Sequence, residues 1–149
     1  MSFKNEVYEQ CKQAIAEKLS MHQQTLHELI ESAADETKSS AGDKYETSLA
    51  MLQIEQDNVR RQIAEVMTMK TMLDVIDPAI GSEVINTGSL IRSGNDYYFI
   101  STGLGKIMVN EKRVIAISPQ SPLGGKLMGL AAGEAVEMNG KQIAVDEVM

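Results

Sequence analysis

The sequence has few of the residues on which common sites depend. Its 149 residues include one cysteine, Cys11, and two histidines, His22 and His27. A single thiol cannot close an internal disulfide and suits a reducing compartment, and this set of side chains cannot build a structural zinc site. No apolar run approaches the roughly 18 residues of a transmembrane helix, and the N-terminal residues lack the apolar core of a secretory signal. We therefore expect a cytoplasmic protein without membrane contact.

Residues 78–149 contain neither histidine nor cysteine, and their serines fall in predicted turns or caps. This composition speaks against a hydrolase or a covalent mechanism. Most of the net negative charge lies in residues 1–77. They hold 8 Lys or Arg against 14 Asp or Glu, which gives −6 of the total net charge of −7. An acidic half of this kind repels phosphate backbones, so we expect no direct, specific binding of DNA.

Residues 1–76 contain no proline, and their one glycine is Gly42. That composition predicts two long helices with a single break between them. Alternating steps of four and three residues, the spacing of a coiled-coil seam, select a largely apolar set on each side of the break. On the first arm these are Tyr8, Lys12, Ile15, Leu19, His22, Leu26, Leu29 and Ala33, and on the second Tyr45, Leu49, Leu52, Gln56, Val59, Ile63, Val66 and Lys70.

The two stripes can be placed in register by folding the chain back at Ser39. This register puts His22 opposite Gln56, so that the two polar seam residues share a layer and can hydrogen-bond. The tip of the hairpin, about 35–44, is small and polar, and Asp43 is expected to cap the second helix. We therefore predict an antiparallel helical hairpin over 1–77.

Residues 78–149 change to short runs typical of strands, separated by turn residues. Asn139-Gly140 indicates a type I′ hairpin. Ser121, Pro122 and Gly129 mark the cap, first position and stop of a short helix. This half is therefore a second domain, and the chain as a whole is α+β. The candidate strands are 82–86, 88–92, 96–101, 106–109, 113–117, 135–138 and 142–148, forming a small antiparallel sheet.

The segment ISPQSPLGGKLMGLAAGEAV at 117–136 resembles the C-terminal domain of the bacterial GreA/GreB transcript-cleavage factors, as do GSEVI at 81–85 and YYFIS at 97–101. The acidic hairpin matches the N-terminal architecture of that family. The resemblance implies an FKBP-like fold for the second domain. It also implies a factor, expected to be monomeric, that binds RNA polymerase at a rim coiled coil and inserts its hairpin into the secondary channel.

By motif position, the resemblance places Ser118, Gln120 and Pro122 on the polymerase-docking surface. In the family, carboxylates at the tip help to hold the second Mg²⁺ of the polymerase, which hydrolyses backtracked RNA. The corresponding acids here would be Asp35, Glu36 and Asp43. The chain would need no cofactor of its own and would not be an enzyme by itself.

Two departures from the family pattern keep a second interpretation open. If Tyr45 is the family's tip tyrosine, Lys38 and Ala41 stand where the acidic pair is expected, and Gln120 replaces an Asp or Asn. A regulator that occupies the channel without stimulating cleavage is therefore the alternative. A peptidyl-prolyl isomerase would need an aromatic-lined cleft, and a coiled-coil chaperone would need exposed apolar residues along the arms.

Overall fold

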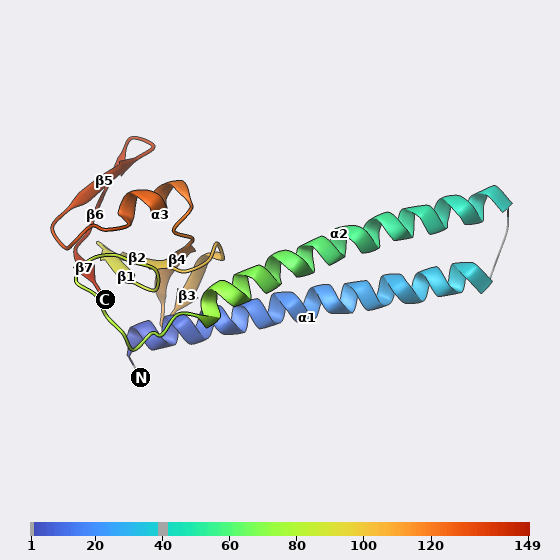
Figure 1. The fold of residues 1–149 in the computed structure, drawn as a ribbon, viewed down its shortest axis with the longest axis horizontal. Helices are drawn as coiled ribbons and strands as arrows, with labels where there is room; N and C mark the ends of the chain where they lie inside the picture. Colours follow the sequence, from blue (N-terminus) through green and yellow to red (C-terminus); the bar gives the residue numbers. More distant parts are fainter. Residues whose placement is uncertain (1, 39–41) are drawn as a thin grey trace. The chain divides into compact units, whose positions relative to one another are not determined.

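The computed structural model describes residues 2–38 and 42–149, with side chains described for 2–35 and 46–149. Two long helices, α1 (Phe3–Lys38) and α2 (Gly42–Asp74), pack antiparallel and precede a β domain (Figure 1). The chain separates into two compact units, one of Met1–Gln13 with Met69–Met149 and one of Ala14–Thr68. The fold class predicted from the sequence, α+β with an N-terminal helical hairpin, is confirmed.

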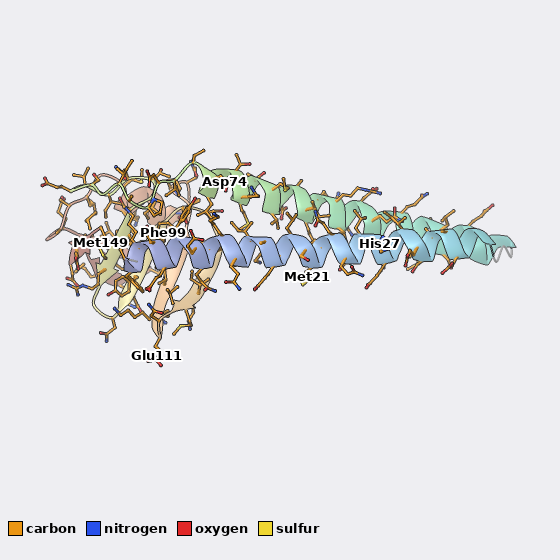
Figure 2. All side chains as sticks on the ribbon, turned by 90° about the horizontal axis from the view of Figure 1, so that it is seen from below. Met21, His27, Asp74, Phe99, Glu111 and Met149 are labelled. Carbon is orange, nitrogen blue, oxygen red and sulfur yellow. The ribbon has the colours of Figure 1, made fainter. Side chains whose placement is uncertain are left out.

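The predicted seam of the hairpin is confirmed with two exceptions, apart from Tyr45, whose side chain lies outside the described residues. The described seam residues from Ile15 to Ala33 and from Leu49 to Val66 are buried or half-buried. Lys12 and Lys70 are exposed, and their places are taken by Cys11, which is fully buried, and by Met69. The apolar neighbour replaces the lysine because an ammonium in the seam would lose its hydration. Side chains such as Met21 and His27 lie on the outer surface of α1 (Figure 2).

The predicted pairing of His22 with Gln56 is wrong. Gln56 is 8% exposed and donates from Nε2 to the Leu29 carbonyl oxygen at 3.4 Å, while its own Oε1 accepts from Arg60 at 3.4 Å. Leu29 lies seven residues nearer to the tip than His22, about 10 Å along α1 at 1.5 Å per residue. The lean of a helical side chain toward the N-terminus of its helix covers only part of this distance, so the hydrogen bond does not fit the predicted register at this layer.

The β domain contains a five-stranded sheet and a separate hairpin. The strands are β1 (Leu90–Ser93), β2 (Asp96–Ile100), β3 (Gly105–Val109), β4 (Lys112–Ile117), β5 (Ala135–Met138), β6 (Lys141–Ala144) and β7 (Glu147–Val148). The sheet order is β3-β4-β2-β1-β7, and β5 pairs with β6. The pair β2–β4 is parallel, so the sheet is mixed rather than antiparallel as predicted. The chain passes beyond the place of β4 to form β3 at the edge and then returns between β3 and β2.

Two predicted strands differ in the structure. Residues 82–86 form only an isolated bridge, Val84 to Ala131, and Ile85 bonds instead to Leu130 and Gly129 beyond α3 (Pro122–Leu127). The predicted strand 142–148 is divided into β6 and β7. The division falls at Val145, whose backbone bonds to Gly133 and Glu134, so that the chain changes partners there. The type I′ turn is confirmed by positive φ angles at Asn139 and Gly140.

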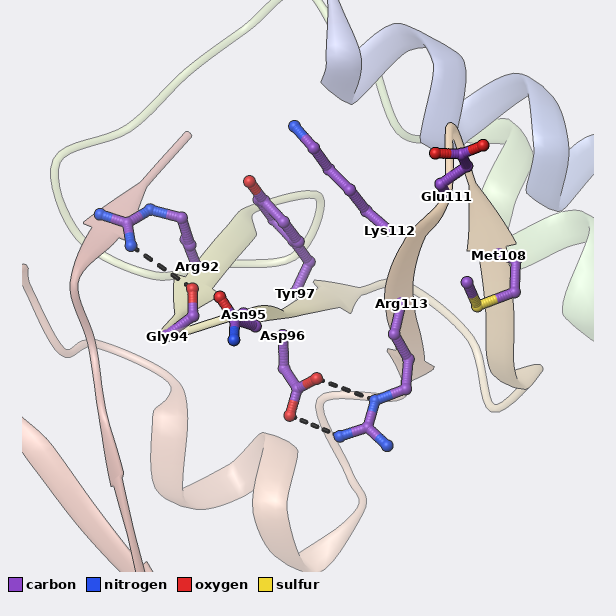
Figure 3. A pocket seen from close by; sticks show the side chains of 9 residues that line it. All are labelled: Arg92, Gly94, Asn95, Asp96, Tyr97, Met108, Glu111, Lys112 and Arg113. Atoms are coloured by element: carbon purple, nitrogen blue, oxygen red, sulfur yellow. Dashed lines mark hydrogen bonds and ion pairs between the residues drawn. The ribbon is translucent and has the colours of Figure 1, made fainter.

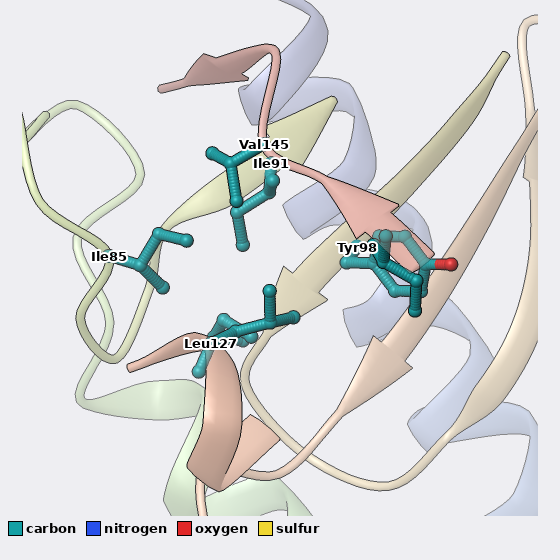
Figure 4. Close-up of a cluster of buried hydrophobic side chains, with 7 residues drawn as sticks. Ile85, Ile91, Tyr98, Leu127 and Val145 are labelled. Carbon is teal, nitrogen blue, oxygen red and sulfur yellow. The ribbon is translucent and has the colours of Figure 1, made fainter. Parts of the chain in front are cut away.

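The core of the β domain lies between one face of the sheet, α3 and the β5–β6 hairpin (Figure 4). Its buried members are Ile85, Ile91, Tyr98, Ile100, Leu127, Ile143 and Val145. The N-terminal turns of α1 belong to the same compact unit. There Lys4 Nζ donates to the Ile80 carbonyl at 2.8 Å, and the Phe3 ring packs edge-on against Tyr97 with centroids 4.8 Å apart. These contacts fix the first turn of α1 to the β domain.

Candidate functional site

The turn that leads into α3 is held by two serines. Ser121 is the N-cap, and its Oγ accepts from Gly124 N–H at 3.0 Å and donates to the Ser118 carbonyl at 2.7 Å. Ser118 Oγ accepts from Ser121 N–H at 3.1 Å, and Pro122 occupies the first helical turn. An N-cap hydroxyl satisfies a backbone N–H that the helix leaves free, and proline suits the first turn because its missing N–H is not needed. The predicted cap and start of the helix are confirmed.

Both ends of α3 are fixed by close contacts. Gly124 is buried against the Ser118 carbonyl, and only glycine fits there because a Cβ atom would stand 2.0 Å from that oxygen. At the other end, Leu127 is fully buried in the core. Gly129 takes a φ of +84° just beyond the helix, as the predicted stop requires. The turn before α3 is therefore a rigid element, which is what a recognition surface needs.

The structure brings Ser118, Gln120 and Pro122 together on this one turn. Gln120 and Pro122 are exposed and present an amide and a ring to solvent. Ser118 is half-buried, and both its hydroxyl and its carbonyl oxygen are used within the turn. Ser118 thus shapes the turn, whereas Gln120 and Pro122 are the residues of the three that a partner can reach. Their role in docking stays a prediction.

The tip of the hairpin holds the other predicted site residues. Asp35 is exposed in the last turn of α1. Glu36 lies one residue further along, and Asp43 is the second residue of α2, so it falls within the first turn rather than at the predicted cap. The side chains of Glu36 and Asp43 lie outside the described residues. Within the described ranges, no three His, Cys, Asp or Glu side chains come together as a metal site.

Sequence reasoning missed a cleft at the end of the sheet where β2 and β4 begin. It has a volume of about 580 Å³ and is open to solvent (Figure 3). Across it, Arg113 pairs with Asp96 through two hydrogen bonds of 2.6 and 2.8 Å, which hold the pKa of the Asp96 carboxyl below its usual value. The lining residues are Arg92, Gly94, Asn95, Asp96, Tyr97, Met108, Glu111, Lys112 and Arg113.

The Lys112-Arg113 dipeptide was the one signal of this cleft in the sequence. It could not reveal the site, because Asp96 stands beside Arg113 only through the parallel pairing of β2 with β4. On the other face, Lys112 Nζ lies 4.7 Å from the centroid of the Phe3 ring and 5.6 Å from that of Tyr97. Cation–π contacts of this kind stabilise a lysine ammonium without neutralising its charge.

Among the comparisons with known proteins, the one with solved structures gave a match. No family model matches the chain, and no curated protein does. The solved structure of the transcription factor Gfh1 is similar, with 17% sequence identity, a TM-score of 0.34, and coverage of 95% of this chain and 92% of that one. None of the described helices has an apolar stretch long enough to span a bilayer. In its C-terminal motif and in its order of elements, two long antiparallel helices followed by a small β domain, the chain resembles the GreA/GreB family.

Proposed function

We propose that this chain is a Gre-like transcription elongation regulator that binds RNA polymerase and inserts its helical hairpin into the secondary channel. The observation that carries the proposal is the combination of a long hairpin with a rigid, exposed turn that contains the family motif. Helix α1 has 36 residues and α2 has 33. At 1.5 Å per residue, helices of this length extend for about 50 Å, which suits insertion into a deep channel. Such a factor would act in the cytoplasm.

The proposed docking contact uses Gln120 and Pro122, because both are exposed on a turn whose shape the Ser118–Ser121 bonds maintain. A binding assay with the cognate polymerase tests it. The double variant Gln120→Ala with Pro122→Ala should weaken binding about tenfold, a typical effect of removing central contacts from an interface. Gln142→Ala, an exposed glutamine on β6, is the matched control and should bind as the wild type does. Equal binding by all three proteins would refute the docking contact.

Stimulation of RNA cleavage is a separate step of the proposal. Extra carboxylates at a polymerase-bound Mg²⁺ can orient a water for attack on a phosphodiester, and Asp35, Glu36 and Asp43 are the tip acids able to supply them. The chemistry would belong to the polymerase. Lys38 and Ala41, which occupy the positions of the family's acidic pair, favour the alternative of a regulator that fills the channel without stimulating cleavage.

Backtracked elongation complexes distinguish these two activities. If the chain stimulates cleavage, Asp35→Asn, Glu36→Gln or Asp43→Asn should reduce the rate at least tenfold with polymerase binding unchanged. If it only occupies the channel, the wild type should compete with a cleavage factor and produce no cleavage of its own. Stimulated cleavage that all three variants retain would exclude these acids as the reactive groups.

The structure gives little support to the other two functions considered. Tyr98 and Phe99 are buried in the β domain, and the cleft at the end of the sheet has Tyr97 as its one aromatic lining residue, so it lacks the apolar wall of an isomerase pocket. A coiled-coil chaperone would need exposed apolar residues along the arms. The structure has such residues outside the seam, namely Met21, Ile30, Met51, Ile54 and Met67. The described seam side chains between Ile15 and Val66 are buried or half-buried, which counts against this function.

A further inference from the structure

A second, smaller cavity lies where the chain leaves α2 and enters the β domain, and we name it the linker pocket. Its volume is about 330 Å³, and eight residues from 75–81 and 86–88 line it. Among the described residues, the two most exposed large apolar side chains are both in this lining, Val75 at 76% and Ile80 at 68%. Exposed apolar side chains that gather at one cavity, rather than scatter singly, are typical of interaction sites.

The first wall of the linker pocket is fixed by three hydrogen bonds. The Asp77 carboxylate accepts from the Ala79 N–H at 2.9 Å, and the Asp77 carbonyl accepts from the Ile80 N–H at 3.2 Å. The Ile80 carbonyl in turn accepts from Lys4 Nζ, in the first turn of α1, at 2.8 Å. The loop that carries Ile80 is therefore held from both sides.

The second wall is a turn closed by Asn86 and Ser89. Ser89 Oγ accepts from the Asn86 N–H and donates to Asn86 Oδ1, both at 3.0 Å. Between them, Gly88 donates its N–H to the Ile100 carbonyl at 2.7 Å and lies so close to Ile76 that a Cβ atom would stand 3.1 Å from the Ile76 Cγ2. The linker pocket is thus already formed, and a partner would lose little entropy in ordering it.

The charges at the rim of the linker pocket are acidic. Residues 71–91 contain three Asp or Glu and no Lys, Arg or His. Asp74 is paired with Lys70 at 2.6 Å, but Asp77 and Glu83 are exposed to solvent. Lys4 lies near Asp77, yet it is only 7% exposed and is bound to Ile80. A partner segment that carries Lys or Arg therefore complements this rim.

The size of the linker pocket argues against a second copy of the chain as its occupant. A stable interface uses about 20–30 residues on each side, and eight residues fall far short of that number. The linker pocket therefore suits a partner that also binds elsewhere. Ile85, which precedes the second wall, is bonded to Leu130 and Gly129 at 2.8 and 2.7 Å, directly beyond α3. Helix α3 has six residues and spans about 9 Å, so the turn before it is one short helix away.

We propose that the linker pocket receives an apolar side chain of the polymerase, from a segment that also carries Lys or Arg. This inference rests on the proposed function and adds a second contact to the turn before α3. Val75, Ile76 and Ile80 surround the apolar side chain, and Asp77 and Glu83 face the basic one. A volume of about 330 Å³ is at the lower end of the range for ligand pockets, about 300–1,000 Å³, which suits a single side chain.

Binding of the full chain to the cognate polymerase tests the proposal. Val75→Ser with Ile80→Ser should weaken binding about tenfold, because it removes the apolar rim. Met108→Ser is the matched control, since Met108 is 55% exposed on β3 and outside the linker pocket, and it should stay within about twofold of wild type. All of these side chains are exposed, so urea denaturation of the variants should match that of the wild type.

A variant that fills the linker pocket distinguishes it from a flat apolar patch. Gly81 lines it, and a Cβ atom there would meet nothing within 4 Å. Gly81→Leu should weaken binding about fivefold by occupying the space, whereas added apolar surface on a flat patch would strengthen binding. Gly103→Leu, between β2 and β3, is the control, because a Cβ atom at Gly103 also meets nothing within 4 Å.

The acidic rim is tested by Asp77→Asn with Glu83→Gln, which should weaken binding about threefold. Glu111→Gln with Glu137→Gln changes the formal charge equally at exposed positions elsewhere and should bind as the wild type does. Tighter binding by Gly81→Leu, or full binding by the Val75 and Ile80 double variant, would overturn the linker pocket while wild-type binding upholds the proposed function. A wild type that does not bind the polymerase would overturn both.

Discussion

Gly124 lies so close to the Ser118 carbonyl oxygen that a Cβ atom on it would stand 2.0 Å away. The atom in the way belongs to the backbone, so the turn before α3 cannot yield by moving a flexible side chain. We therefore expect Gly124→Ala to lower the free energy of unfolding by about 2 kcal/mol or more, as overpacking of a tight site does. Urea denaturation at neutral pH measures this change.

Gly125→Ala is the matched control for this prediction. A Cβ at Gly125 would lie 3.7 Å from the Pro119 carbonyl oxygen, which is ordinary contact. Alanine is favoured over glycine inside a helix by about 0.5–1 kcal/mol, so this variant should be neutral or slightly more stable. Similar stabilities for the two variants would show that the turn can relax, contrary to the geometry.

Gln56 in the hairpin seam should be replaceable by leucine with a gain in stability. Its hydrogen bond to the Leu29 carbonyl is long, at 3.4 Å, and that carbonyl also accepts the ordinary helical bond from four residues ahead. Gln56→Leu thus leaves no essential acceptor unpaired and buries more apolar surface, for a gain of about 1 kcal/mol. Thermal unfolding of the chain measures it.

The exposed neighbour Gln53 supplies the control for the seam. Gln53→Leu adds the same apolar side chain outside the contact between the helices, so the change should be within about 0.5 kcal/mol. If Gln56→Leu instead destabilises the hairpin, the hydrogen bonds of Gln56 contribute more than the packing gained.

The Asp96–Arg113 pair predicts a specific dependence of stability on pH. The hydrogen bonds from Arg113 lower the pKa of Asp96 below its model-peptide value of 3.8, so the unfolded chain takes up a proton on this carboxyl at a higher pH than the folded chain does. The contribution of Asp96 to stability is therefore complete above about pH 4 to 5 and is lost as the pH falls through the lowered pKa. The difference in unfolding free energy between wild type and Asp96→Asn should shrink as the pH is lowered from about 5 through the lowered pKa of Asp96. A constant difference would contradict the assignment.

Cys11 should be unreactive in the folded protein. Burial of the thiol raises its pKa from 9.0 to about 12, so almost no thiolate forms at pH 8. A disulfide reagent such as DTNB should react slowly with the native chain and rapidly in urea. Between pH 9 and about 12 the unfolded chain loses this proton and the folded chain keeps it, so stability should fall with rising pH. Cys11→Ala should remove that part of the pH dependence.

The helical hairpin was predictable because its determinants are local. The lack of proline up to residue 76 and the seam spacing do not depend on distant parts of the chain, and neither do the Ser121 cap and the Asn139-Gly140 turn. Two of the errors within the hairpin were displacements by a single residue. Lys12 and Lys70 were placed in the seam because spacing alone does not weigh the hydration of an ammonium against its neighbour's apolar side chain.

The sequence by itself determined two long helices, the short helix with its capped turn, and most of the strands. Tertiary structure alone decided the order of those strands. The backbone groups that pair β2 with β4 are the same in every strand, so the sequence does not show which strands will be neighbours. That pairing sets Asp96 beside Arg113 in the cleft at the end of the sheet. The division at Val145 and the bonds of Ile85 also depend on contacts between distant residues, because a strand's backbone bonds to whichever edge the packed core brings to it.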